Sequence, residues 1–356
     1  MISNRHLLIK EDASFIEKQY LDLMKKISTK GNLKHNRTGT DTLSLFGESL
    51  RHSMNVGFPL LTTKKMFFRG IFEELIWFLN GDTKLKPLLE KGVKIWLDDA
   101  FSKYQKGNWT DMTKKEFEVR IMNDPEFEKK WGDLGPIYGH QWRKFGEKGN
   151  EYSNHNDYSA GVDQIVNLIK DLTNSPDSRR MIVNAWNPAD IHLMTLPPCH
   201  YGFQVITREL TEDEVNYFKE NESVDVSHLG LPSPIASNAL PLPTRAISLL
   251  WTQRSVDTFL GLPFNIASYG LLLELLAMKM NMVPEDLICS LGDTHLYVNH
   301  LDQVQEQLSR DPDTHPSPTL KFSDGCSSKN LEDLKYEDVK LTDYSSFDQI
   351  KAQIST

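Results

Sequence analysis

The stretch that decides the fold class, residues 247–291, reads ISLLWTQRSVDTFLGLPFNIASYGLLLELLAMKMNMVPEDLICSL. Residues 247–252 at its start and 287–291 at its end are short apolar runs, which predict strands. Between them, residues 264–281 are apolar over the length of a long helix. Strands combined with long helices are typical of a domain in which helices pack on a sheet, so we expect an α+β fold.

The rest of the chain continues this mixture, without an internal repeat or a clear linker. Apolar residues at helical spacing predict helices over residues 12–29, 66–80 and 162–173. Gly31 and Gly81 follow the first two and are expected to end them. Further strands are predicted over residues 43–56, 181–186, 201–207, 319–322 and 339–341.

Two segments have the composition of surface insertions. Residues 102–130 are helix-prone and rich in Lys, Glu and Asp. Residues 209–244 begin acidic, end in a Pro-rich stretch, and join two predicted strands where a short turn would suffice. We expect both segments at the surface, and a tolerated loop insertion is the simplest interpretation of the second.

The composition limits the classes of partner. Of the 356 residues, 39% are hydrophobic and 25% are charged, which is typical of a globular protein. The net charge of −9, from 40 basic and 49 acidic residues, opposes non-specific binding to DNA or to an anionic membrane. Arginines are nevertheless grouped locally, as at Arg179 and Arg180, which fits a small phosphate ligand better than a polymer.

The three cysteines, Cys199, Cys289 and Cys326, are too few for a disulfide framework. No Cys-x-x-Cys or His-x-x-x-His pair occurs, so we expect no metal site. No apolar run approaches the roughly 20 residues that span a bilayer, and the N-terminus lacks the apolar core of a signal peptide. We therefore expect a cytoplasmic protein, with a nuclear location left open.

Cys199 is the first candidate for chemistry. It follows Pro197 and Pro198, which fix the backbone just before a predicted strand. A lone cysteine is commonly a buried structural residue. The alternative is a thiolate nucleophile, which requires nearby positive charge, and Arg254 at the end of another predicted strand is a candidate source.

Polar residues in apolar surroundings supply the other candidates. Glu73 and Glu74 lie in a predicted helix so apolar that one carboxyl is expected to be buried, with a raised pKa suited to proton transfer; two acids on a narrow polar stripe are the alternative. Asn265 would cap a helix, or its amide would read the O4 and N3–H edge of uracil. His295 and Tyr297 would bind a sugar hydroxyl or satisfy each other.

Together these residues lie in motifs that resemble thymidylate synthase over nearly the whole chain. The matching blocks are RTGT at 37–40, FPLLTTKK at 58–65, ELIWF at 74–78, GPIYG at 135–139, DSRR at 177–180, the segments around Cys199, Arg254 and Asn265, and GDTHLY at 292–297. The resemblance implies one α+β catalytic domain over residues 1–356, with a mixed sheet packed by long helices. One face of that sheet would be used for homodimerisation.

The resemblance also implies the chemistry. Cys199 would attack C6 of dUMP, and C5 would then take the one-carbon unit of 5,10-methylenetetrahydrofolate to give dTMP and dihydrofolate, with no metal. Glu74 would manage protons through water, and Tyr138 would assist removal of the C5 proton. Arg254 and Asp257 complete the implied catalytic set.

The implied ligand contacts form two groups. The dUMP contacts are Arg37, Arg254, Ser255, Asp257, Asn265, His295 and Tyr297, together with Arg179 and Arg180 donated across a homodimer interface. The folate contacts are Lys64, Glu74, Ile95, Trp96, Asp257, Leu260, Phe264 and Ser355.

Three features depart from the family's pattern: a polar C-terminal end, Gly270 where alanine is usual, and Tyr201-Gly202 after the Cys199 motif. They leave a dUMP hydroxymethylase as an alternative function, in which water rather than hydride attacks the exocyclic methylene. An inactive nucleotide- or RNA-binding regulator is an alternative of another class. A cysteine hydrolase would need His200 as base, and on a strand that residue points away from Cys199.

Overall fold

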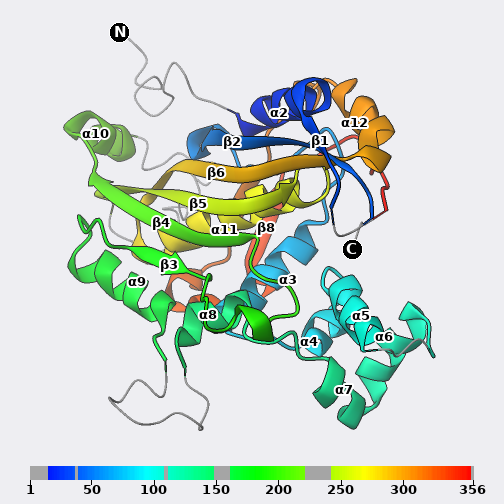
Figure 1. The fold of residues 1–356 in the computed structure, drawn as a ribbon. Helices are drawn as coiled ribbons and strands as arrows, with labels where there is room; N and C mark the ends of the chain where they lie inside the picture. The colour runs from blue at the N-terminus through cyan, green and yellow to red at the C-terminus, as the bar shows by residue number, and fades with distance from the viewer. Residues whose placement is uncertain (1–14, 37–38, 108–110, 148–160, 221–241, 354–356) are drawn as a thin grey trace. The chain divides into compact units, whose positions relative to one another are not determined.

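The computed structural model describes residues 15–36, 39–107, 111–147, 161–220 and 242–353 (Figure 1). These residues pack as two compact units. Unit 1 lies within residues 1–67, 171–181 and 203–355, and unit 2 lies within residues 68–170 and 182–202.

The largest sheet has six strands in the order β1, β2, β6, β5, β4, β3. β2 pairs antiparallel with β1 and β6, whereas β5 and β6 run parallel, so the predicted mixed sheet is confirmed. The strands are β1 (Asn32–Lys34), β2 (Thr42–Ser53), β3 (Ile182–Asn184), β4 (His200–Glu209), β5 (Arg245–Asp257) and β6 (Val283–Tyr297). A separate antiparallel pair joins β7 (Thr319–Phe322) to β8 (Val339–Thr342).

Helix α11 (Gly261–Met280) joins β5 to β6 and packs against both strands. Figure 1 shows it, in yellow, lying along one face of these strands. By length and composition it could cross a membrane, so the expectation that no apolar run reaches this length is wrong. Because 78% of its most apolar stretch is buried inside the protein, its all-round hydrophobicity fits a core helix.

Glycine at position 270 has a steric explanation. A Cβ built on this residue would lie 2.4 Å from the Cγ atom of Pro59, so no side chain fits without moving that ring. The departure from the family's usual alanine is therefore matched by a close approach of α11 to the segment around Pro59.

The helices predicted over residues 12–29, 66–80 and 162–173 are present to within a few residues where they are described. α2 (Ile16–Lys30) ends at Gly31, and α3 (Phe68–Leu79) is followed by Gly81 with a φ of +71°. Residues 12–14 of the first predicted helix lie outside the described residues. The others are α4 (Leu85–Glu90), α5 (Leu97–Lys106), α6 (Lys114–Asn123), α7 (Pro125–Trp131), α8 (Tyr138–Lys144), α9 (Gln164–Asn174), α10 (Glu212–Glu220) and α12 (Leu301–Leu308).

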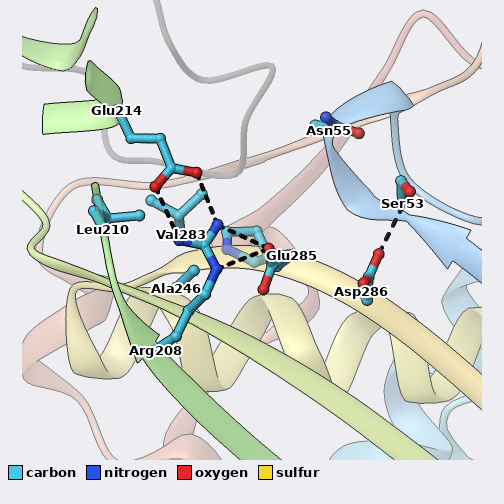
Figure 2. Close-up of a pocket in the computed structure, with 10 residues that line it drawn as sticks. Ser53, Asn55, Arg208, Leu210, Glu214, Ala246, Val283, Glu285 and Asp286 are labelled. Carbon is cyan, nitrogen blue, oxygen red and sulfur yellow. Dashed lines mark hydrogen bonds and ion pairs between the residues drawn. The ribbon is translucent and has the colours of Figure 1, made fainter. Parts of the chain in front are cut away.

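The first part of the segment 209–244 is anchored by charge. Figure 2 shows the Arg208 guanidinium between two carboxylates, 2.7 Å from Glu214 of α10 and 2.8 Å from Glu285 of β6. These acceptors raise the pKa of Arg208 above its ordinary value. Phe218 of α10 is buried against Val283 beside this ion-pair cluster. Residues 221–241 lie outside the described part of the chain.

Glu274 lies on α11 with its side chain buried, and its Oε2 atom has no hydrogen-bond partner among the described residues. Burial raises the pKa of this carboxyl from 4.5 to about 8. Between these two values the folded chain holds a proton that the unfolded chain has lost. The contribution of Glu274 to stability therefore falls as the pH rises through this range.

We expect Glu274→Gln, which keeps the shape of the side chain but cannot ionise, to raise the melting temperature by about 3 °C or more near pH 8.5. The change should be much smaller near pH 5, where the native carboxyl is already protonated. Thermal denaturation followed by circular dichroism measures both. Glu212→Gln, at an exposed position of α10, is the control and should change neither value. Equal effects of Glu274→Gln at the two pH values would contradict the assignment.

Candidate active site

Cys199 lies immediately before β4 in unit 2, on the backbone stiffened by Pro197 and Pro198. It is half-buried, and its backbone N–H donates to the Tyr138 hydroxyl at 2.7 Å. Cys289 and Cys326 are buried, and burial raises the pKa of both thiols, that of Cys289 to about 12. Cys199 is thus the most accessible thiol of the three, and the one suited to act as a nucleophile.

Tyr138 is the first residue of α8 and is held among aromatic rings of unit 2. Its ring stacks on His200 at 4.2 Å between centroids, and it lies 5.0 Å from Phe78 and 5.8 Å from Trp96. Burial lowers the pKa of His200 to about 3, so its imidazole is neutral near pH 7. A base this weak is poorly suited to the role that a cysteine hydrolase would require of it.

The two adjacent acids of α3 have different partners. The Glu73 carboxylate is ion-paired, 2.6 Å from Lys91 and 3.9 Å from Arg69. Glu74 has no such ion pair among the described residues, and its Oε1 atom accepts a hydrogen bond of 2.8 Å from the Trp96 indole. Burial raises the pKa of Glu74 to about 7, against the opposing effect of that hydrogen bond. Near neutral pH this carboxyl can therefore both accept and donate a proton.

Ile95 and Trp96 lie at the start of α5 in unit 2. Trp96 is buried, and Ile95 is half-buried beside it. The Trp96 ring also lies 6.2 Å from Trp77 of α3. The structure therefore brings Cys199, Tyr138, Glu74 and Trp96 into one unit, linked through hydrogen bonds and ring contacts.

The carboxyl ends of β5 and β6 in unit 1 carry the second group of predicted residues. Because these strands are parallel, Asp257 lies in register with His295, and Ser255 with Asp293. His295 Nδ1 lies 3.3 Å from an Asp293 oxygen, and its ring meets that of Tyr297 edge-on at 5.4 Å. Arg254 and Ser255 are half-buried on β5 in the same region.

Asp257 organises the turn between β5 and α11. Its Oδ1 atom accepts hydrogen bonds of 3.0 Å from the backbone N–H groups of Phe259 and Leu260. The helix begins directly afterwards, with Leu260 at its N-cap, so the interpretation of Asn265 as the cap is wrong. Asn265 and Phe264 lie half-buried within the first turns of α11.

Gln253 is a site residue that the sequence reasoning missed. Its Oε1 atom accepts from Asn265 Nδ2 at 3.1 Å and from the Trp251 indole at 3.3 Å. The orientation of the Asn265 amide is thereby fixed within unit 1. The only available signal was the position of Gln253 directly before Arg254 in the quoted motif.

Lys64 is buried in unit 1, with 5% of its surface exposed. Its ammonium donates to the Phe259 carbonyl and lies 4.0 Å from the Phe259 ring centroid. Burial lowers its pKa to about 7, although Asp257 acts in the opposite direction. Glu17, a second residue that was missed, binds the backbone N–H of Thr63 at 2.7 Å and so fixes the segment leading to Lys64.

The other predicted residues have no described contact with either of these two groups. Arg179 and Arg180 are exposed on unit 1. Arg37 and Ser355 lie outside the described residues. In the described part of the chain no group of three or more His, Cys, Asp and Glu side chains is arranged to hold a metal ion.

A sequence model of the family described as "Thymidylate synthase" matches residues 18–356. The chain belongs to the thymidylate synthase family. Members of this family are enzymes, and this protein is accordingly a methyltransferase. The family accounts for the motifs that carry both groups of polar residues.

Named relatives agree with the family match. A thymidylate synthase of Mesoplasma florum is 40% identical over 339 residues, covering 95% of this chain and 99% of the relative. One of Zymomonas mobilis is 40% identical over 341 residues, with the same coverage. A bifunctional dihydrofolate reductase-thymidylate synthase of Paramecium tetraurelia is 40% identical over 345 residues, covering 97% of this chain and 62% of that protein.

Proposed function

We propose that this protein converts dUMP to dTMP by reductive methylation with 5,10-methylenetetrahydrofolate and releases dihydrofolate. The observation that carries the proposal is the arrangement in unit 2. An accessible thiol, Cys199, is bonded through its backbone to Tyr138, and Tyr138 contacts the Trp96 ring that donates to Glu74. The family's reaction requires a nucleophile and a proton carrier whose pKa lies near 7.

Cys199 supplies the covalent step. Its thiolate adds to C6 of the uracil ring, and the electron pair of the C5–C6 bond moves to C5, which becomes nucleophilic. The folate supplies the one-carbon unit that C5 takes up and the hydride that completes the methyl group. Removal of the C5 proton, with help from Tyr138, breaks the bond to the folate nitrogen and leaves an exocyclic methylene on the ring. Hydride transfer from the folate to that methylene then lets the ring expel the Cys199 sulfur and regain its C5–C6 double bond.

Glu74 supplies and removes protons through water. Its pKa of about 7 leaves both protonation states populated near neutral pH. Trp96 stabilises the charged state by donating to Oε1, so the carboxyl can return to the carboxylate after each transfer. Ile95 and Trp96 place apolar surface beside the Glu74 carboxyl. Such a surface suits the aromatic ring of the folate, which carries polar groups at its edge.

The second group of residues would bind dUMP and the remainder of the folate. We assign the phosphate to Arg37, Arg179, Arg180, Arg254 and Ser255, the ribose to His295 and Tyr297, and the base to Asn265. Guanidinium groups suit a phosphate dianion because their N–H donors form bidentate hydrogen bonds. Folate contacts are assigned to Asp257, Leu260, Phe264 and Ser355. Lys64 is assigned to the same group, where its ammonium donates to the Phe259 carbonyl beside Leu260 and does not extend into solvent.

The active form is proposed to be a homodimer, formed through one face of the sheet. Phe46 on β2 and Ile206 on β4 are 82% and 55% exposed, which is unusual for apolar side chains within strands. Arg179 and Arg180 are also exposed, as donation to a partner subunit would require.

The product distinguishes the proposal from a dUMP hydroxymethylase. With dUMP and methylenetetrahydrofolate we expect dTMP and dihydrofolate in equal amounts, measured by chromatography and by the absorbance of dihydrofolate. Cys199→Ala should lower kcat on the order of 10⁴-fold, because no covalent adduct can form, while dUMP still binds. Cys326→Ala, at a buried thiol, is the matched control. Release of tetrahydrofolate with hydroxymethyl-dUMP would support the rival, and turnover by Cys199→Ala would refute the covalent role.

Asn265→Asp should shift the preference from dUMP toward dCMP. A protonated or charged carboxyl no longer presents the amide N–H and C=O pair that matches uracil. We expect the ratio of kcat/KM for dUMP to that for dCMP to fall by about 10- to 100-fold. Steady-state kinetics with both nucleotides measure it, and Asn174→Asp, at an exposed position, is the control. An unchanged ratio would reject amide-based recognition of the base.

A mixing experiment tests the donated arginines. Arg180→Ala and Cys199→Ala should each be nearly inactive alone, since each lacks one part of every site. Unfolding and refolding them together should restore about a quarter of the native activity, because half of the mixed dimers' sites regain both residues. Activity that never exceeds the sum of the separate variants would argue that Arg180 acts within its own subunit.

A further inference from the structure

Trp96 is flanked on both sides by residues that are ion-paired to one helix. Lys94, two residues earlier, lies 2.6 Å from Glu118 of α6. Asp98, two residues later, lies 2.5 Å from Lys114 of the same helix. Helix α6 belongs to the charged segment 102–130, so this insertion contacts the chain on either side of the indole.

The insertion can hold these positions because it has a packed core of its own. Phe117 of α6 is fully buried, with its ring 5.4 Å from Tyr104 and 5.5 Å from Phe101, both on α5. Helix α5 begins directly after Trp96, whose carbonyl accepts from the Ala100 N–H at 3.1 Å. Apolar packing thus joins α6 to α5. The two half-exposed ion pairs add little stability by themselves, so we assign them the task of fixing where α6 lies along the segment around Trp96.

The direction of the indole matters because its N–H donates to the Glu74 carboxyl at 2.8 Å. That hydrogen bond is the influence that lowers the pKa of Glu74 against the effect of burial. A small rotation of Trp96 would lengthen the bond and leave burial unopposed. The position of the Trp96 ring therefore influences the pKa of Glu74, the proposed proton carrier.

We propose that α6 is a positioning element of the active site, which holds both flanks of Trp96 and so aims its indole at the Glu74 carboxyl. Glu118 and Lys114 are its positioning residues. This inference rests on the proposed function, in which Glu74 carries protons. If the insertion were merely tolerated at the surface, loss of these ion pairs would leave Trp96 unaffected.

The test variant is Lys114→Gln/Glu118→Gln, which removes both flank contacts without changing the net charge. Its control, Lys115→Gln/Glu126→Gln, removes one charge of each sign from exposed positions of α6 and α7. Trp96→Phe gives the effect of losing the donor completely. Far-UV circular dichroism and the melting temperature establish that each variant is folded, and the single change Glu118→Gln replaces the double one if that variant unfolds.

Two measurements report on the indole and on the carboxyl. The first is the ¹H–¹⁵N resonance of the Trp96 indole, assigned by its disappearance in Trp96→Phe; it should move in the test variant and stay in place in the control. The second is the pH dependence of kcat. We expect the apparent pKa of the proton carrier to lie about one pH unit higher in Trp96→Phe, and part of that distance higher in the test variant.

Restoration of the native resonance by the charge exchange Lys94→Glu/Glu118→Lys would further support the proposal. A folded test variant with an unchanged indole resonance and an unchanged pH profile would overturn it. Failure of the proposed function is separate: the native protein would then release no dihydrofolate from dUMP and methylenetetrahydrofolate. The indole resonance requires no turnover, so it would still decide whether α6 positions Trp96.

Discussion

Unit 1 depends on the burial of one apolar helix. α11 is covered on the side of β5 and β6, and its leucines are almost fully removed from water: Leu271, Leu272, Leu273, Leu275 and Leu276. Each buried leucine contributes about 1.5 to 3 kcal/mol. This packing fixes the start of α11 against the carboxyl ends of two parallel strands, and those ends carry the polar groups assigned to the nucleotide. Precise placement of Asp257, Asn265 and His295 is a consequence of covering the helix.

In unit 2 the governing effect is desolvation. Burial raises the pKa of Glu74 and lowers that of His200, so it favours the neutral form of each side chain. For Glu74 the indole of Trp96 opposes this effect, so the carboxyl titrates near neutrality rather than remaining protonated. Glu73, one residue earlier on the same helix, is instead ion-paired with Lys91. Chemically identical neighbours thus have different partners because of the packing around them.

The two segments that the sequence predicted as insertions differ in how they join the rest of the fold. The segment 102–130 has a buried aromatic core and forms ion pairs on both sides of Trp96, so it is part of the architecture around a residue of the candidate site. The described beginning of 209–244 is held to the strands by the ion pairs of Arg208 and by the burial of Phe218. The sequence predicted both at the surface, the segment 102–130 because it is rich in Lys, Glu and Asp, and the segment 209–244 because it begins acidic and ends in a Pro-rich stretch.

Apolar periodicity in the sequence predicted α2, α3, α9 and α11 and the strands other than β1, since it reflects which face each element must bury; β7 was predicted to the residue. It also determined the family, because the motifs around Cys199, Arg254 and Asn265 are long and ordered. The structure was needed to show that Asn265 lies inside the helix with its amide fixed by Gln253, that Lys64 is buried, and that burial raises the pKa of Glu74 to about 7. These properties depend on desolvation and on partners distant along the chain, such as Trp96 for Glu74, and local sequence patterns contain no information about such contacts.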